Sequence, residues 1–530
     1  MLMLEKSVAS AAQATTATSN KIEGVGGWAL AALFGFIVFL LWGTGFASDD
    51  YVYLQRGLAQ SIAANWWPTT QISTPVWHYM YSLPFIVIGN RPWAYDLLKA
   101  LYAGIATYGA YRFFAIFCLP RRALLLGFLF VFLPLHDAAT YSLICFYLVL
   151  SFSAYLFAYS LGVEGRYKSS FLVALLGSFS SYGSPPIALG LAVLALLHRQ
   201  RAVIVSLLVP NAIYVAYFLT TQLVLQIGRQ RLTSEFGLAA LAKQYLLQLV
   251  TFLDAAVGPS AWAKLLYSLM SLNPLGLVIG LAAALALLRY VAKERRDAAD
   301  LRLIVAALVI LLSSFAMFSV TGLLPQLAFN LGDRVMTYGS FFLICLLASL
   351  RMPRVVEGSI VVLLVLAIVG ISTHWKQWTH EVDQVAANIR TNESIRELPA
   401  GTLLYVSGHQ YSQLGPFSHI EFFTDDYVVQ TFFKLQLGAN TSLHFASFNR
   451  RLVFEQGRLR DRKYGDTNAV TGAIWLYDSE RNVLERVDAS DLPRRLQALP
   501  DEKRHWTQWL PDGWLKERLL EAVPRLRYAY

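Results

Sequence analysis

The sequence predicts a mainly α-helical protein: a polytopic membrane bundle of about eleven transmembrane helices, followed by a C-terminal α/β domain. Three observations support this fold class. The 530 residues are 56% hydrophobic and only 15% charged, whereas soluble chains are about half apolar and a quarter charged. The apolar residues fall in runs close to the roughly 20 residues that a membrane helix needs. After Ile371 the runs stop and shorter alternating segments begin.

Three parts are therefore expected along the chain. Residues 1–26 are polar at first and rich in Ser, Thr and Ala, and we interpret them as a cytoplasmic tail. The apolar run that follows is too long for a secretory signal. Residues 27–372 form the transmembrane domain, and residues 373–530 form a periplasmic α/β domain.

Eleven apolar runs can each form a membrane helix. In chain order they are Trp28–Ala47, Leu97–Phe117, Ala123–Leu135, Ala139–Leu161, Phe171–Tyr182, Pro186–Leu197, Ala202–Leu225, Leu275–Tyr290, Leu303–Thr321, Val335–Leu350 and Val355–Ile371.

The basic residues predict how these helices are oriented. With a cytoplasmic N-terminus, every tight basic cluster faces the cytoplasm, as the positive-inside rule requires. These clusters are Arg121-Arg122, Glu164–Lys168, His198–Arg201, Lys293–Arg302 and Arg351–Arg354. The C-terminal domain then lies on the opposite, outer side.

Two segments of the membrane domain need a separate interpretation. The runs on either side of SYGSPP are short, and its prolines cannot continue a helix, so we expect a tight helical hairpin or a pair of broken helices. Phe236–Leu272 is moderately apolar but contains Lys243, Asp254 and Lys264. We interpret it as interfacial helices on the outer surface.

The C-terminal part has the pattern of a small α/β domain. TLLYVSG and TSLHFASF alternate like strands, and AIWLYD and VLERV flank a hairpin turn at SERN. The charged segment His374–Leu398 has helical spacing and connects the last span to this domain. His409, His419, Glu421, Asp425 and Asp426 match no metal-ligand spacing, and we interpret them as surface polar residues.

The distribution of charged residues and of cysteines excludes nucleic-acid binding and paired or metal-binding cysteines. The net charge of +10 comes largely from short clusters between apolar runs, so it is a topology signal and no nucleic acid is expected to bind. Cys118, Cys145 and Cys345 lie in apolar runs without paired spacing. We expect them to be packing residues.

Ionisable residues at the outer ends of spans are the candidates for chemistry, because charge near hydrocarbon is costly. One group is Asp49 and Asp50 after the first span, and a second is His136 and Asp137 between the third and fourth. Each acid could instead cap a helix. The third is Asp333-Arg334 before the tenth span. Its guanidinium could bind a phosphate through a bidentate fork or extend to lipid headgroups.

The first outer loop adds further candidates. Tyr53 and Arg56 follow the acid pair closely and could contact a substrate. Trp67 could stack on a sugar, although most aromatic residues of this loop are typical of an interfacial belt. That belt would include Trp66, Trp77, His78, Tyr79 and Tyr81.

Together these features resemble the GT-C superfamily, the polytopic glycosyltransferases that use polyprenyl-phosphate-linked sugars. The resemblance rests on SDD in the first outer loop, PLHDAA in the second, the hairpin at SYGSPP, the arginine of GDRVMTYGSFF and the outer C-terminal domain. It implies that Asp50 or Asp49 is catalytic, with Asp50 slightly preferred. It also implies a catalytic Asp137 and a phosphate-binding Arg334, with His136 beside them.

The sequence also departs from parts of the superfamily. There is no WWDYG-like signature of oligosaccharyltransferases and no DxD triplet in the first loop. A strict metal requirement is therefore not implied. Asp49 and Asp137 could nevertheless share a divalent cation, Mg²⁺ or Mn²⁺, through oxygen ligands.

The resemblance implies transfer of a sugar, with inversion, from a polyprenyl-phosphate donor to a cell-envelope acceptor. The acceptor would be a glycan, lipid or protein, and the location the bacterial inner membrane. Two alternatives stay open. An O-antigen ligase or polymerase would use the outer segment with Arg229 and Arg231, and a transporter would use broken helices and intramembrane charge.

Overall fold

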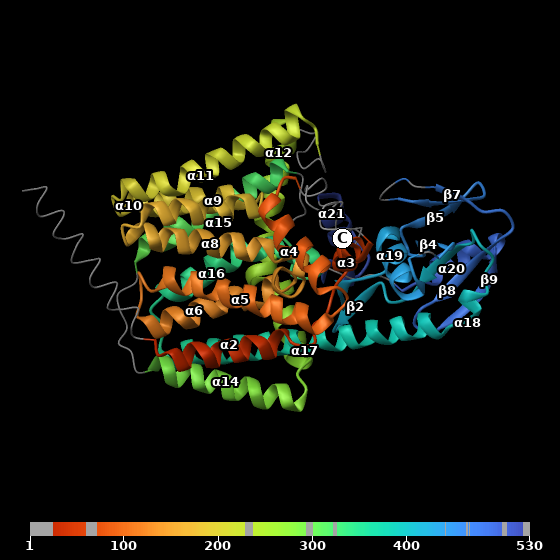
Figure 1. The fold of residues 1–530 in the computed structure, drawn as a ribbon, viewed down its shortest axis with the longest axis horizontal. Coiled ribbons are helices and arrows are strands. Elements are labelled where there is room, and N and C mark those ends of the chain that lie inside the picture. The colour runs from red at the N-terminus through yellow and green to blue at the C-terminus, as the bar shows by residue number, and fades with distance from the viewer. Residues whose placement is uncertain are drawn as a thin grey trace, which may run out of the picture.

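The computed structural model describes residues 25–522, except for 60–71, 228–236, 293–299, 322–325, 440, 463–464, 466 and 501–505. Long helices lie side by side in a bundle, and a smaller domain containing all the described strands sits at one end (Figure 1). We call this end of the bundle the domain end, and the opposite one the far end. The mainly α fold with a C-terminal α/β domain is thus confirmed.

Each of the eleven predicted runs overlaps a bundle helix, although the fourth, Ala139–Leu161, is interrupted at Ser142 and its long helix begins only at Tyr147. The bundle helices are α2 (Gly27–Leu41), α5 (Pro92–Phe114), α6 (Pro120–Phe132), α8 (Tyr147–Val163), α9 (Tyr167–Ser180), α10 (Ser184–Leu197), α11 (Arg201–Leu219), α14 (Pro274–Ala292), α15 (Leu301–Val320), α16 (Thr337–Ser349) and α17 (Arg354–Thr391). Proline stands in the first turn of α5, α6 and α10, where its missing N–H leaves no bond unmade. The prolines of SYGSPP therefore begin α10, and the predicted pair of helices there is confirmed.

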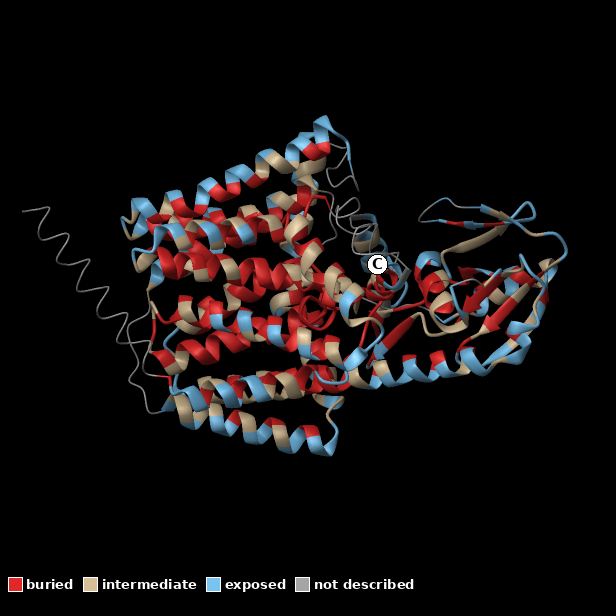
Figure 2. Ribbon diagram, in the orientation of Figure 1, coloured by how far each residue is buried: buried red, intermediate tan, exposed pale blue. Residues whose placement is uncertain are grey.

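The chain is a multi-pass membrane protein by the length and hydropathy of its helices. Seven described helical stretches are long and apolar enough to cross a membrane, and α2 and α10 are shorter apolar helices. Exposed residues lie along the outer faces of the bundle, whereas its interior is buried (Figure 2). On α14 the exposed side chains include Leu275, Val278 and Leu285, which is the surface that lipid tails require.

Between the bundle helices lie shorter elements at the domain end. α3 (Asp49–Ala59) and α4 (Pro75–Ile88) follow the first span. η1 (Pro134–His136), α7 (Ala138–Tyr141) and η2 (Leu143–Cys145) join α6 to α8, and η4 (Leu331–Met336) precedes α16. η3 (Thr220–Val224) extends α11 as a π-helix.

α12 (Leu238–Val257) and α13 (Pro259–Met270) are the helices in the segment for which the sequence predicts interfacial helices. They are separated at Gly258 and together are long and apolar enough to span a membrane. α13 packs on α17 and also contacts η1 and β2, elements of the domain end. Their interfacial position stays a prediction.

Residues of the predicted basic clusters contact polar or charged groups of other segments at the far end. Arg122 pairs with Glu357 at 3.0 Å, and Arg112 pairs with Glu164. Arg121 donates to the Tyr290 carbonyl, and His198 pairs with Asp300 at 3.3 Å. Segments far apart in the sequence therefore place their charges together, as the predicted topology requires.

The last span and the linker to the C-terminal domain are one continuous helix. α17 runs for 38 residues and leaves the bundle toward the domain (Figure 1). The predicted domain boundary after residue 372 falls inside it, so the helical connection is confirmed. A short helix, α18 (Glu393–Arg396), follows.

The C-terminal domain is built on a four-stranded sheet in the order β4-β1-β8-β9. β1 (Leu403–Ser407) pairs in parallel with β4 (His444–Ser447) and β8 (Ala473–Asp478), and β9 (Val483–Asp488) is antiparallel to β8. These are the four predicted strands. α19 (Asp426–Leu437) packs on β4, and α20 (Leu492–Ala498) follows β9.

Smaller elements complete the domain. β2 (Tyr411–Leu414) and β3 (Phe417–Glu421) form a hairpin, and β5 (Leu452–Glu455), β6 (Arg458–Asp461) and β7 (Thr467–Ala469) form an antiparallel meander. After β9 and α20 come η6 (Trp506–Trp509) and α21 (Trp514–Ala522), while η5 (Ala489–Asp491) precedes α20.

Candidate active site

The turn at η2 is the point where two of the predicted site segments meet. The Asp50 carboxylate accepts from the backbone N–H of Leu143 at 3.3 Å and of Ile144 at 2.9 Å. It also accepts from the N–H of Ala47 at 3.0 Å. Asp50 is wholly buried, so its three bonds hold the first outer loop against the second.

Burial sets the electrostatics of Asp50. Desolvation raises the pKa of this carboxyl to about 6, while the backbone N–H groups of Ala47 and Ile144 oppose the rise. Removing a carboxylate from water disfavours its charged form. Asp50 therefore titrates close to neutral pH.

A buried ion pair that the sequence reasoning missed supports the loop before Asp50. Asp96 accepts from the N–H of Gly43 at 2.8 Å and of Gly45 at 3.1 Å. Lys99 lies 3.2 Å from Asp96 and donates to the Gly45 carbonyl. Two charges three residues apart at the start of an apolar helix were the signal that could have found this pair.

Asp49 has a different environment from its neighbour. Its side chain is only partly buried, and its Oδ1 accepts from the Tyr427 hydroxyl of α19 at 2.9 Å. Asp49 thus faces the C-terminal domain, whereas Asp50 faces the bundle. Of the two acids, Asp49 is the more accessible.

Arg334 of η4 contacts η2 through its side chain. Its side chain is partly buried, and among the described residues its hydrogen bond is from Nη1 to the Cys145 sulfur at 3.5 Å. A thiol is a weak acceptor, and a guanidinium carries five N–H donors. Both Asp50 and Arg334 act electrostatically on Cys145, so the structure brings the first and third predicted places together.

The other candidates of the first loop have aromatic neighbours. The exposed Arg56 lies 5.5 Å from the Tyr53 ring, and Tyr53 packs on Tyr81. Trp77 and Tyr81 are buried, and Trp77 donates to the Ile144 carbonyl at 3.2 Å. Their assignment to an exposed interfacial belt is therefore wrong, because they pack inside the bundle. Trp66 and Trp67 lie outside the described residues, as do Arg229 and Arg231.

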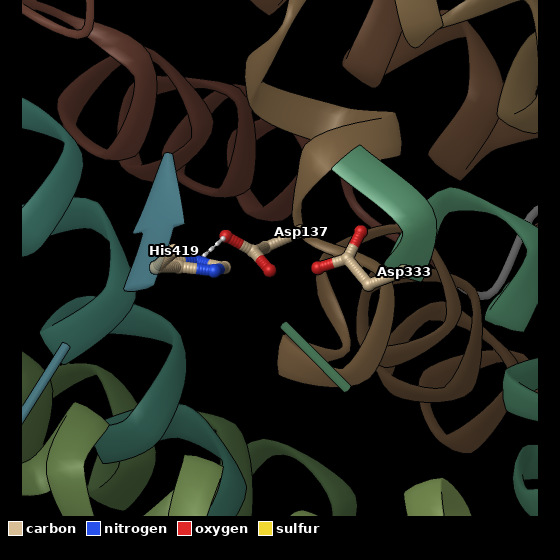
Figure 3. A group of neighbouring side chains, drawn as sticks. All are labelled: Asp137, Asp333 and His419. Atoms are coloured by element: carbon tan, nitrogen blue, oxygen red, sulfur yellow. Dashed lines mark hydrogen bonds and ion pairs between the residues drawn. The ribbon is translucent and has the colours of Figure 1, made fainter. Parts of the chain in front are cut away.

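The second predicted place belongs to a separate, fully buried cluster. Asp137 and Asp333 face each other, with His419 on the other side of Asp137 (Figure 3). Lys264 bridges the two carboxylates, 2.5 Å from Asp137 and 2.6 Å from Asp333. Asp137 also accepts from His419 at 2.9 Å and from the Trp375 indole at 2.6 Å.

His419 and Asp425 are predicted from the sequence to be surface residues, and this prediction is wrong because both are buried. His419 is buried because the β2–β3 hairpin projects toward the bundle. Asp425 pairs with Arg451 at 2.6 Å. The Asn330 N–H donates to Nδ1 of His419, so Nε2 carries the proton and donates to Asp137. The sequence carried no local signal for this contact, since Lys264, Asp137 and His419 come from three distant segments.

Burial and neighbouring charges together determine the protonation of Asp137 and His419. Burial alone would raise the pKa of the Asp137 carboxyl, but Lys264 and His419 outweigh it and hold that pKa well below its usual value. Burial also lowers the pKa of His419, against the opposing charge of Asp137. An anionic Asp137 and a neutral His419 follow.

His136 and its neighbour Asp137 point in different directions. His136 is fully buried, and its Nδ1 lies 2.7 Å from the Ser340 hydroxyl of α16. The ring packs near Phe130 of α6. His136 therefore belongs to the bundle interior.

The donor set decides whether the buried cluster suits a divalent cation. Ligand atoms of Asp137, Asp333 and His419 lie within 4.8 Å of one another. However, the Lys264 ammonium stands between the two carboxylates, and both ring nitrogens of His419 are engaged in hydrogen bonds. Because a metal needs free lone pairs, these residues as arranged do not fit one. Asp49 is bonded to Tyr427 and is not part of this group.

Comparisons with known proteins add little. No protein-family model and no curated protein matches the sequence. Among solved structures, the chain is similar to the arabinofuranosyltransferase AftD from mycobacteria, at 12% identity and a TM-score of 0.38. The match covers 86% of this chain and 35% of that one, so the chain spans about a third of the length of that protein.

Proposed function

We propose that this chain is a GT-C-type membrane glycosyltransferase that transfers a sugar from a polyprenyl-phosphate donor to a cell-envelope acceptor, with inversion. The observation that carries the proposal is the meeting of Arg334 with the Asp49-Asp50 segment at η2. Arg334, with one weak hydrogen bond among the described residues, and Asp50 both contact η2 at the domain end of an apolar bundle, and Asp49 is the neighbour of Asp50 in the chain. The membrane would be the bacterial inner membrane, with the domain end periplasmic.

Arg334 is the group that would bind the donor phosphate. Within the described part of the chain, its hydrogen bond to a thiol leaves most of its five donors for another acceptor. A planar guanidinium can bind two phosphate oxygens at once. The isoprenoid tail would lie in the apolar surroundings of the helices, as lipid chains do.

Asp49 is the group that would act as the general base. It is partly exposed, whereas Asp50 is enclosed and already accepts three backbone N–H bonds. A base must reach the hydroxyl of the acceptor. We therefore assign Asp49 as the catalytic residue and Asp50 as a positioning residue, which reverses the slight preference drawn from the sequence.

The reaction is a single displacement. The acceptor oxygen attacks the anomeric carbon and its proton passes to the Asp49 carboxylate. The bond between the anomeric carbon and the phosphate oxygen breaks, and polyprenyl phosphate leaves. Its negative charge develops in the transition state, where the Arg334 guanidinium would stabilise it most. No step requires a metal at the Asp137 cluster.

The experiment is a transfer assay with purified protein and a panel of radiolabelled polyprenyl-phosphate sugars and envelope acceptors. We expect Asp49→Asn to lower the rate by about 10²- to 10⁴-fold, and Arg334→Gln to be impaired more than Arg334→Lys. The matched control is Arg121→Gln at the far end, which should keep activity. Equal rates for wild type and Asp49→Asn would refute the assignment.

A further inference from the structure

The C-terminal domain contains a cavity of about 270 Å³ that the proposed reaction does not use. Ser407 and Gly408 at the end of β1, and Asp478 at the end of β8, line it. β1 stands between β4 and β8 and is parallel to both, so the chain crosses from one side of β1 to the other. Ligands of open α/β sheets bind at such a switch point, beyond the carboxyl ends of the strands.

The lining has many hydrogen-bonding groups and charged groups of both signs, three acids and two arginines. Gln410, Gln413 and Ser418 contribute amides and a hydroxyl. Four of the five charged lining residues occur in pairs: Arg495 lies 2.8 Å from Glu485, and Arg481 lies 3.7 Å from Asp478. The fifth, Glu480, accepts from the His409 N–H at 3.3 Å and leaves the lining with one excess negative charge. This charge disfavours an anion, whereas the polar groups suit a neutral ligand with many hydroxyl groups.

Aromatic and apolar groups complete the lining. Tyr411 contributes a ring and Leu499 contributes aliphatic surface, whereas Phe448 and Leu476 of the lining are buried. Sugars have both hydroxyl groups and apolar C–H faces, and aromatic side chains pack on those faces. A pocket with mainly polar groups and a ring therefore favours a carbohydrate over a lipid.

The β2–β3 hairpin lines one side of the cavity and also contacts the bundle. Ser418 of β3 lines the cavity, and the next residue, His419, bonds to Asp137 at 2.9 Å. At the tip of the same hairpin, Gly415 packs against the Tyr267 ring of α13. A ligand in the cavity would therefore contact the hairpin that joins the domain to the membrane part.

From this position and chemistry we infer that the cavity binds a neutral oligosaccharide, and that this oligosaccharide is part of the acceptor. The second half of the inference rests on the proposed function. The first half does not, because binding can be measured without transfer. The site would hold the growing or receiving glycan on the side of the membrane where Asp49 and Tyr427 meet.

The test uses full-length protein in lipid nanodiscs, which avoids detergents with sugar headgroups. The probe is an array of neutral and anionic oligosaccharides. Ala498 is an exposed lining residue at the end of α20, so Ala498→Trp should fill the cavity without disturbing the core. Gln497→Trp changes the exposed neighbour, which does not line the cavity, and is the matched control.

We expect wild type and Gln497→Trp to bind neutral oligosaccharides, and Ala498→Trp to bind them at least tenfold more weakly. With a substrate that is transferred, Ala498→Trp should raise the KM for the acceptor by a similar factor. Binding that survives in Ala498→Trp, a preference for anionic glycans, or no binding by wild type would each overturn the inference. Glycan binding by a wild type that transfers no sugar would refute only the proposed function.

Discussion

The burial of Asp50 raises its pKa and thereby sets the pH range in which transfer activity is expected. Its pKa of about 6 lies above that of an exposed aspartate, so it takes up a proton as the pH falls through 6. The protonated carboxyl can no longer accept all three backbone N–H bonds that hold η2. Transfer activity is therefore expected to fall below pH 6, and Asp50→Asn should lose this limb of the pH profile.

The effect of Asp50 protonation on folding stability distinguishes the expected loss of activity from acid unfolding. The folded-state pKa of Asp50 is raised, so the folded state binds the proton more tightly than the unfolded state does. As the pH falls from about 6 toward 4, this residue therefore favours folding. Melting temperature measured across the same pH range should not fall through Asp50, and an acid limb that persists unchanged in Asp50→Asn would contradict the account.

Lys264 is the residue whose loss should be most costly. Replacing it by Met leaves the Asp137 and Asp333 carboxylates buried together without their cation. Breaking a buried ion pair from one side costs about 3–5 kcal/mol, so Lys264→Met should lower the melting temperature strongly. Lys264→Met/Asp333→Asn replaces one of the two facing carboxyl groups by an amide and should recover part of the loss.

The position of Lys264 also predicts that the buried cluster does not bind a metal ion. Mn²⁺ should not raise the melting temperature of the wild type through this cluster, because Lys264 fills the space between the carboxylates. A stabilisation by Mn²⁺ that disappears in Asp333→Asn would show that the ion displaces the lysine.

At the scale of elements, α13 and α17 pack closely at Gly370. A β-carbon added there would lie 1.8 Å from the Ser268 carbonyl oxygen, a distance no packing allows. Gly370→Ala should therefore push the helices apart and cost about 1–3 kcal/mol. Gly358→Ala, in the same helix, has its nearest neighbour at 3.9 Å and is the control. Thermal unfolding in detergent measures both, and equal melting temperatures would contradict this packing.

The elements were largely predictable because their signals are local. Each predicted apolar run, and each of TLLYVSG, TSLHFASF, AIWLYD and VLERV, contains enough consecutive residues to identify a helix or strand. The contacts of Lys264 were not predictable, since a lysine in an amphipathic segment looks the same whether it meets water or a carboxylate 127 residues away. For the same reason the sequence predicted that Asp50 and Arg334 lie on one side of the membrane, but it could not identify η2 as the element that both contact.

At the scale of the whole molecule, His419 and Tyr427 connect the C-terminal domain to the candidate site. They bond to Asp137 and Asp49, which lie in separate loops of the bundle. His419→Ala should leave Asp137 without one donor and loosen the hairpin. Hydrogen–deuterium exchange is expected to rise at residues 411–421 and 134–138, while Tyr427→Phe should affect residues near Asp49 instead. Unchanged exchange in both variants would mean that these bonds do not couple the two parts.

The most direct measurement of the central claim is the fate of a polyprenyl-phosphate sugar added to the purified wild type with an acceptor mixture in nanodiscs. The account predicts that free polyprenyl phosphate appears together with an inverted sugar–acceptor linkage, and that both are lost in Asp49→Asn. Donor that stays intact with every acceptor, while proteoliposomes of the same protein take up a solute, would contradict it and favour a transporter.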